Sequence, residues 1–538
     1  MKLFLSLLRS SPYVVVSMGI LGLLTGLFSV GLIVMINFVL HADSQPMILA
    51  FGFAALILGK LATNAISQVL LVRLSQNIIL DLCKDLCQKV TAAPFRRIEE
   101  LGPARILAVL TDDIASLGLA IQNIPFVVVN GAILTGCSFY LAWLSSKLFL
   151  VLLGIVLIGM ATYKLLLSRA QFANRQIRDG RDRLFQQFRS LTEGIKELLM
   201  HRARRESFHS QNIGSTIQFL RHHSLAAASQ YILLDSFTQV MFFGMIGGLL
   251  FFGPRIQSIP KESLTGYCLA TLYMMGPIWA FIGIIPTFQR GQVSLFKVED
   301  LRQRLQDQGT LPDCTEENLR VKEWKALELK DIVFTYESQN GREDHFILGP
   351  LNFTLHPGEL VFIVGGNGSG KSTFAKLLVG LYSPQQGEIF LDGELVSNPN
   401  RVGYREQFSV VFSDFYLFDS LLGLDSEDID AKARECLSML HLSQKVDVQN
   451  GIFSTTLLSQ GQRKRLALLT AYLEDRPVYL FDEWAADQDP QYKEIFYCRI
   501  LPSLRARGKA VIVITHDDRY FHLGDRVIKL EYGKIVSE

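Results

Sequence analysis

Long apolar runs before residue 310 limit the possible folds of this chain more than any other feature. A helix needs about twenty apolar residues to cross the hydrocarbon layer of a bilayer, which is roughly 30 Å thick. Six stretches have that length, and they lie near residues 13–41, 47–72, 116–144, 148–168, 227–253 and 264–289. The pattern predicts an all-α transmembrane domain over residues 1–310.

Length and composition agree with a membrane protein of more than one domain. The chain has 538 residues, which is too long for one ordinary domain, and 49% of them are apolar. The opening residues, MKLFLSLLRSSP, contain a very short apolar run that no small-residue cleavage site follows. They are predicted to form an amphipathic helix at the membrane surface.

The basic residues predict the orientation of the helices. Lys and Arg are numerous in segments 73–115 and 169–225, whereas the loops near 42–46, 145–147 and 254–263 are short and hold few. Cytosolic loops are enriched in these residues. Both termini and the two long segments are therefore predicted to face the cytosol.

Lys60, Lys164 and Asp235 lie within or beside the apolar stretches, where an ionisable group is costly and usually functional. Lys164 and Asp235 are interpreted as residues near the inner membrane surface. Lys60 lies deeper and is a candidate for substrate contact. Polar residues that could line the same region are Asn64, Gln122, Asn123, Asn130 and Gln239.

From residue 325 the pattern changes to short β-type runs separated by turns and helices, which predicts an α/β domain over residues 325–538. The strand-like VFIVGG leads directly into GNGSGKST and a helical segment. A strand, a glycine-rich loop and a helix in that order form a phosphate-binding loop. Backbone N–H groups of the loop would hold phosphates, Lys371 would reach the outer ones, and Ser372 would ligate Mg²⁺.

Other motifs in this half support nucleotide hydrolysis. The apolar segment VYLFDE ends in two carboxylates, of which Asp482 would hold Mg²⁺ and Glu483 would act as general base. LLSQGQRKR precedes that segment, and its Ser459 and Gly461 could contact a γ-phosphate. A further apolar segment, VIVITHDD, places His516 at its end.

In order and spacing these motifs resemble those of an ABC ATPase. They match its Walker A motif at 365–373, its signature motif at 458–462, its Walker B motif at 478–483, its D-loop at 486–489 and its switch histidine at His516. The resemblance implies that Tyr336 stacks on adenine and that two such domains bind ATP and Mg²⁺ head to tail. One chain has one copy of each motif, so a homodimer is expected. The nucleotide-binding residues that the resemblance implies are Tyr336, Gly365, Asn367, Gly368, Ser369, Gly370, Lys371, Ser372, Thr373, Ser459, Gly461 and Gln462.

The sequence departs from the common pattern of that family at three positions. Ser413 stands where a glutamine is usual and is assigned to Mg²⁺ with Ser372 and Asp482. Gln460 stands where glycine is commoner, and Trp484 where a small residue is usual. With segments 94–114 and 191–208, these regions resemble cyclic-peptide and siderophore-peptide exporters, the group that includes pyoverdine-precursor and syringomycin exporters.

The fold class expected is therefore a multidomain membrane protein, with a six-helix domain of the ABC-exporter type followed by an α/β ABC nucleotide-binding domain. The expected function is ATP-driven export of a peptide across the bacterial cytoplasmic (inner) membrane, with lipid around the helices and a possible periplasmic or outer-membrane partner. The alternatives are a flippase or exporter of lipids and other amphiphiles, and an ATP sensor that gates a partner protein.

Other function classes receive little support from the sequence. The chain has no basic stripe interleaved with aromatic residues, so nucleic-acid binding is not predicted. The cysteines number seven and contain no CxxC pair, so neither a disulfide framework nor a cysteine metal site is predicted. An uptake system is disfavoured because importers usually keep the membrane and ATPase parts on separate chains.

Overall fold

A computed structural model describes residues 12–42, 47–256, 260–306, 324–336, 346–424 and 428–537. The amphipathic helix predicted at the N-terminus lies outside these residues. The chain divides into two compact units, Met1–Lys84 with Ala108–Asp300, and Asp85–Leu107 with Leu301–Glu538. The first is helical and the second is α/β, which confirms the predicted fold class. The domain limits 1–310 and 325–538 stay predictions.

Helices build the first unit, and several of them continue well beyond the apolar stretches. Among the described residues, five helical stretches are long and apolar enough to cross a membrane, and a shorter apolar segment covers Ser146–Gly159. The helices up to residue 306 are α2 (Pro12–His41), α3 (Met47–Ala92), α4 (Phe95–Leu101), α5 (Pro103–Ala108), α6 (Ile114–Gln122), α7 (Ile124–Leu144), α8 (Ser146–Glu193), α9 (Ile195–Met200), α10 (Arg202–Ser207), α11 (Ser215–Ile256) and α12 (Lys261–Gln306), with π-helical turns at Val109–Asp113 and Phe208–Gly214.

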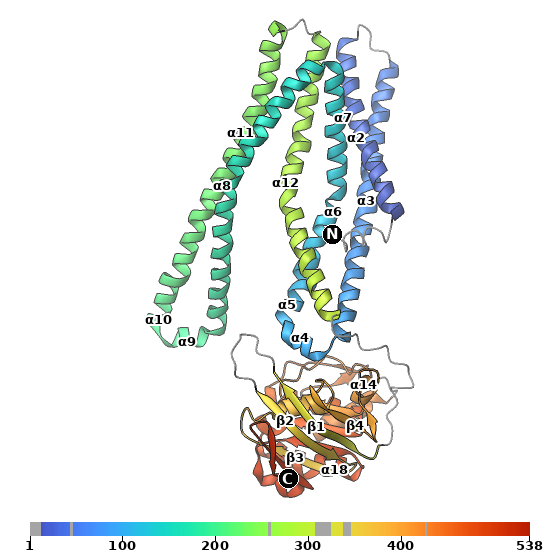
Figure 1. Cartoon of the computed structure of the whole chain (residues 1–538), viewed down its shortest axis with the longest axis vertical. Coiled ribbons are helices and arrows are strands. Elements are labelled where there is room, and N and C mark those ends of the chain that lie inside the picture. The colour runs from blue at the N-terminus through green and yellow to red at the C-terminus, as the bar shows by residue number, and fades with distance from the viewer. Residues whose placement is uncertain are drawn as a thin grey trace. The chain divides into compact units, whose positions relative to one another are not determined.

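Neighbouring helices of this unit pack in pairs. The long helices α8 and α11 run side by side, as do α2 and α7 (Figure 1). Hydrogen bonds join helices that are far apart in the sequence: Asn37 Nδ2 on α2 donates to Tyr140 Oη on α7 at 3.0 Å, and Tyr267 Oη on α12 donates to Leu141 O on α7 at 2.6 Å. Trp143, in contrast, is 81% exposed. Polar contacts inside and apolar side chains outside are the arrangement that a lipid environment favours.

The ionisable residues singled out within the apolar stretches have different surroundings. Lys60 Nζ donates to Tyr273 Oη at 2.9 Å, which links α3 to α12. Asp235 accepts a hydrogen bond from Gln239 Nε2, one turn further along α11, at 3.0 Å. The side chain of Lys164 lies outside the part of the chain that the structure describes.

Two larger sheets form the centre of the second unit. The antiparallel sheet has the order β2-β1-β4-β5, and the other has the order β12-β11-β3-β10-β9-β6, with β3, β6, β9, β10 and β11 parallel. The strands are β1 (Leu327–Thr335), β2 (Ile347–Leu355), β3 (Leu360–Val364), β4 (Gln386–Leu391), β5 (Glu394–Leu395), β6 (Phe408–Val411), β7 (Val448–Gln449), β8 (Ile452–Phe453), β9 (Val478–Asp482), β10 (Ala510–Ile514), β11 (Arg526–Glu531) and β12 (Lys534–Ser537).

Helices pack around these sheets. They are α13 (Lys371–Leu378), α14 (Arg401–Arg405), α15 (Ile429–Met439), α16 (Gln460–Glu474), α17 (Pro490–Ile495) and α18 (Leu501–Ala506), with turns η4 (Trp484–Asp487), η5 (Phe496–Ile500) and η6 (Asp518–Leu523). Strands β9 and β10 are buried along their whole length, as expected of central parallel strands. Because the carboxyl ends of parallel strands meet at one edge, the segments after β3, β9 and β10 lie together.

Segment 85–107 belongs to the second unit, although it lies far from it in the sequence. The ring of Phe95 is 6.1 Å from that of Tyr382, and Lys376 Nζ is 3.0 Å from Glu99 Oε1. Tyr382 also donates a hydrogen bond to Glu99. These contacts join residues 95–100 to the nucleotide-binding half.

Candidate active site

The phosphate-binding loop connects β3 to α13 and folds closely around its own lysine. Lys371 Nζ donates to the carbonyl oxygens of Gly365 at 2.9 Å and Gly366 at 3.0 Å. Lys371 is only 6% exposed. The hydroxyl of Ser369 is buried and has no hydrogen-bond partner among the described residues. The loop therefore holds a fixed cation beside backbone N–H groups, as a phosphate site requires.

Close packing requires glycine at two positions of this loop. A Cβ atom on Gly365 would lie 2.2 Å from Leu530 O, and one on Gly370 would lie 2.7 Å from Leu348 Cδ1. Gly370 also has a φ of 102°, a left-handed backbone conformation that residues with a side chain rarely adopt. The neighbouring Gly366 has no atom within 4 Å of an added Cβ.

We expect Gly365→Ala to destabilise the nucleotide-binding unit by about 1–3 kcal/mol, because backbone atoms must move to admit the methyl group. Gly366→Ala is the matched control and should change stability little. Thermal unfolding of the full-length protein, with and without ATP, measures both effects. Equal melting temperatures for the two variants would contradict the close approach to Leu530.

A cavity of about 500 Å³ opens over the loop. Its lining contains eight of the twelve residues assigned to nucleotide, namely Tyr336, Asn367, Gly368, Ser369, Gly370, Lys371, Ser372 and Thr373, together with Glu483, which was assigned as the base, and Phe346. The sequence had not indicated Phe346. It begins the segment that leads into β2, and its carbonyl oxygen accepts a hydrogen bond from Tyr336 N at 3.4 Å.

Tyr336 is held at the edge of this cavity by other aromatic residues. Its hydroxyl lies 3.2 Å from Thr373 Oγ1 and 3.3 Å from Tyr382 Oη. Its ring meets the ring of Phe334 edge-on at 5.3 Å. Tyr336 is 38% exposed, so part of its ring is available for contact with a flat ligand such as a nucleotide base.

Asp482 ends β9 and is 2% exposed. Its Oδ2 accepts a hydrogen bond from Ser413 Oγ at 3.2 Å, and its Oδ1 is buried with no partner among the described residues. The pKa of Asp482 is raised, first by burial and then by the nearby charge of Glu483. Hydrogen bonds from Ser413 and Ser372 lower this pKa and so oppose the rise. Carboxylate and hydroxyl oxygens are the ligands that Mg²⁺ prefers, so Ser372, Ser413 and Asp482 fit this ion.

Glu483 directly follows β9 and has a φ of 50°, which is unusual for a residue with a side chain. Its N–H donates to Ile514 O at 3.0 Å, so β10 fixes this backbone conformation. Glu483 Oε1 lies 3.3 Å from His516 Nε2. The two residues predicted to be catalytic are therefore brought together at the carboxyl edge of the sheet.

The signature residues occupy the N-terminus of α16. Ser459 caps that helix, since Gln462 N donates to Ser459 Oγ at 3.4 Å and Ser459 N donates to Gln462 Oε1 at 3.2 Å. The cavity over the phosphate loop has none of Ser459, Gly461 and Gln462 in its lining. Within one chain, the described structure does not bring the signature residues to the loop that holds Lys371.

A polar network connects the start of α16 to the residues that follow Glu483. Lys464 is 4% exposed in its side chain, and its Nζ lies 2.7 Å from Asp487 Oδ2 and 3.0 Å from Glu483 O. Trp484 Nε1 donates to Lys464 O at 2.7 Å. Sequence reasoning gave Lys464 no role and placed Asp487 only within the D-loop at 486–489. The only sequence feature that pointed to Lys464 was its position two residues after the signature motif.

Gln460 and Gln488 extend this network at the N-terminus of α16. Gln460 Nε2 donates to Asp487 Oδ2 at 3.3 Å, and Gln488 Nε2 donates to Gly461 O at 2.9 Å. Gln460 and Trp484, two of the departures from the usual motifs, therefore belong to one set of contacts.

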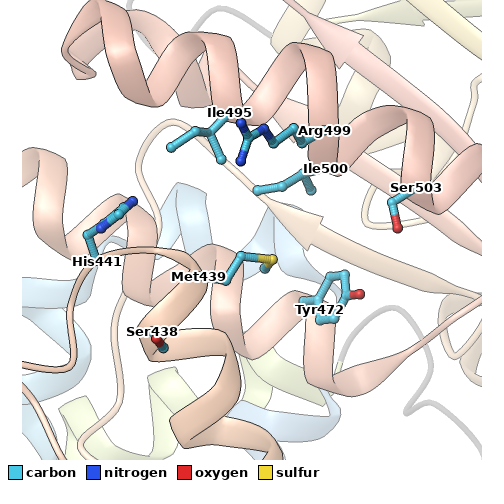
Figure 2. Close-up of a pocket in the computed structure, with 8 residues that line it drawn as sticks. All are labelled: Ser438, Met439, His441, Tyr472, Ile495, Arg499, Ile500 and Ser503. Atoms are coloured by element: carbon cyan, nitrogen blue, oxygen red, sulfur yellow. The ribbon is translucent and has the colours of Figure 1, made fainter.

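A second cavity, of about 430 Å³, lies between α15, α16 and the segment from α17 to α18 (Figure 2). It shares no lining residue with the first cavity and includes none of the predicted site residues. Its lining consists of Ser438, Met439, His441, Tyr472, Ile495, Arg499, Ile500 and Ser503.

Both halves of the chain match known protein families. Residues 13–259 match the family described as ABC transporter transmembrane region, and residues 348–486 match the family described as ABC transporter. ATP-binding protein SyrD from Pseudomonas syringae pv. syringae is 34% identical over 537 residues, which cover 98% of this chain and 95% of SyrD.

More distant relatives and one solved structure are also similar to this chain along most of its length. The ATP-dependent lipid A-core flippases of Wigglesworthia glossinidia brevipalpis and Vibrio cholerae serotype O1 are each 24% identical, over 90% and 91% of this chain and 84% and 85% of those proteins. The structure of a bacterial Atm1-family ABC exporter with ATP bound has a TM-score of 0.72 at 18% identity, over 98% of this chain and 95% of that one. At that identity the likeness concerns the fold alone. The chain therefore belongs to the ABC transporter family, as an ATP-hydrolysing half-transporter of the exporter type.

Proposed function

We propose that this ABC exporter moves a peptide out of the bacterial cytosol across the cytoplasmic membrane. The observation that carries the proposal is the 34% identity to SyrD over nearly the whole length of both chains. It includes the segments in both halves whose sequences resemble peptide exporters. The lipid A-core flippase relatives are only 24–26% identical and match less of the chain, although they keep a lipid cargo as the second candidate.

A homodimer is the proposed working unit. The signature residues of one chain lie apart from its own phosphate loop, and the chain carries one copy of each motif. A second copy placed head to tail would bring its Ser459 and Gly461 to the ATP that this chain holds. The orientation with both termini and the ATPase half in the cytosol is also proposed, on the basis of the Lys- and Arg-rich segments 73–115 and 169–225.

The residues of the site have distinct proposed roles in hydrolysis. Tyr336 contacts the base, and Lys371 with the loop N–H groups holds the phosphates. Glu483 takes a proton from the attacking water, and His516 holds the carboxylate of Glu483 in position. Ser372, Ser413 and Asp482 would hold Mg²⁺, which offsets phosphate charge when it is bound.

Coupling to the membrane helices is proposed to involve segment 85–107. Its Phe95 and Glu99 contact Tyr382 and Lys376, and Lys376 lies on α13, directly after the phosphate loop. ATP can drive transport only if it binds one arrangement of the two subunits better than another. Because these contacts lie so close to the phosphate loop, a change in the loop on ATP binding would be transmitted through segment 85–107 to α3.

Transport in inside-out membrane vesicles tests the proposed function. The vesicles contain the wild-type protein or Glu483→Gln, and ATP is added with an N-acylated peptide mixture or with a fluorescent phospholipid. ATP-dependent accumulation of peptides by the wild type alone supports peptide export. Movement of the phospholipid without accumulation of any peptide would favour the flippase and overturn the proposal.

The role proposed for Ser413 can be tested separately. Ser413→Ala removes a hydrogen bond that lowers the pKa of Asp482, so that pKa rises further. The acidic limb of the pH profile of ATP hydrolysis should therefore shift to higher pH. The Mg²⁺ concentration for half-maximal activity should rise by about tenfold. Ser443→Ala, at an exposed serine, is the control, and an unchanged Mg²⁺ dependence in Ser413→Ala would remove Ser413 from the metal site.

A further inference from the structure

Lys60 occupies the middle of the apolar stretch 47–72, which is the first part of α3. It is the only Asp, Glu, Lys or Arg between residues 47 and 72, and it lies thirteen residues after Met47 and thirteen before Arg73. At 1.5 Å per residue, each side corresponds to about 20 Å of helix. Its position on α3 therefore corresponds to the centre of the hydrocarbon layer, where a charge is most costly.

The contacts of Lys60 do not neutralise its charge. Its ammonium group donates to Tyr273 Oη at 2.9 Å and lies 5.4 Å from the centre of that ring. Tyr273 lies on α12, and the sequence from 263 to 289 contains no Asp, Glu, Lys or Arg. Among the described residues, no carboxylate forms an ion pair with Lys60. Since an ammonium group has three N–H donors, the bond to Tyr273 leaves two of them.

Lys60 and Tyr273 together present donors suited to an oxyanion. Tyr273 Oη accepts the bond from Lys60, so its own O–H remains able to donate. Lys60 is half-buried and therefore still accessible in part. A hydrogen bond in which one partner is ionised is about twice as strong as a neutral one. A carboxylate that accepts from both side chains would supply the negative charge that the helices around Lys60 lack.

We propose that Lys60 and Tyr273 bind a carboxylate of the transported peptide at the centre of the membrane domain. This inference rests on the proposed export of peptides and adds an anionic group to the description of the cargo. The pair lies on helices α3 and α12 of the same unit, so it needs no residue of the nucleotide-binding half.

The experiment compares two forms of one peptide mixture. N-acylated hexapeptides of random sequence without Asp or Glu are prepared with a free C-terminal carboxylate and with a C-terminal amide. ATP-dependent uptake of each form is measured in inside-out vesicles by mass spectrometry. The variants are Lys60→Gln, Lys60→Arg and Tyr273→Phe, and Lys261→Gln, at the exposed start of α12, is the control.

The ratio of acid to amide uptake is the quantity compared, because a partly unfolded variant lowers both forms equally. The wild type and Lys261→Gln should prefer the acid by about tenfold, which is the value of one charge-assisted hydrogen bond. In Lys60→Gln the acid-to-amide ratio should fall close to one. Lys60→Arg should retain most of the preference for the acid, and the ratio of Tyr273→Phe should lie between those of Lys60→Gln and the wild type.

Contrary results separate this inference from the proposed function. Equal uptake of the two forms by the wild type, or a preference that Lys60→Gln leaves intact, would overturn the carboxylate site while peptide export stands. If wild-type vesicles take up neither form but move phosphatidylglycerol, both the peptide cargo and the carboxylate site are wrong.

Discussion

Replacing the proposed general base with its amide, Glu483→Gln, should reduce ATP turnover by about 10²–10⁴-fold. The carboxylate is the only proton acceptor that the described cavity lining presents at this edge of the sheet. Glutamine has nearly the same shape, so the contact with His516 and the backbone conformation at φ 50° can remain. ATP binding through Lys371 and the loop should therefore persist.

The variant should consequently accumulate as an ATP-bound dimer. Nucleotide retention after gel filtration and the mass of the complex measure this state, and the phosphate-release rate measures turnover. Glu494→Gln changes an exposed carboxylate on α17 and should behave as the wild type. Steady hydrolysis in Glu483→Gln would show that another group is the base.

The active site shows which features the sequence can predict. The phosphate loop and the Asp482–Glu483 pair follow from strand patterns and short motifs, because each depends on residues close together in the chain. The apolar runs of β3, β9 and β10 identified central parallel strands, whose ends must share one edge. The proximity of Glu483 and His516 is a consequence of that topology.

Other features depend on contacts that no local pattern encodes. Phe346 lines the nucleotide cavity because β1 and β2 pair in one register, and register is set by packing on both strands. Segment 73–115 was predicted to be cytosolic, but no short motif pairs Glu99 with Tyr382, which lies 283 residues further along the chain. No pattern in the sequence indicates that Lys464 is buried, because its burial depends on the fold of η4 against α16.

Lys464 contacts residues of two functional motifs, so its replacement should also reduce ATP turnover strongly. It follows the signature motif, which in the proposed dimer contacts the ATP of the partner subunit. Its ammonium group binds the carboxylate of Asp487 and the carbonyl of Glu483, the proposed base for the ATP of its own subunit. A change at Lys464 therefore affects the position of the base without touching Lys371 or the phosphate loop.

Lys464→Met keeps the length of the side chain and removes both contacts. Asp487 is 45% exposed and can be hydrated, so the loss of stability should be about 1–3 kcal/mol, below that of a fully buried pair.

ATP turnover of Lys464→Met should fall on the order of ten- to a hundredfold, because a small displacement of Glu483 misplaces the base. The KM for ATP should change little, and the fluorescence of Trp484, whose indole binds Lys464 O, should report the displacement. Lys445→Met, at an exposed lysine, is the control. A variant with normal turnover, or one in which only ATP affinity falls, would assign Lys464 to structure alone, since a residue that positions Glu483 must alter kcat.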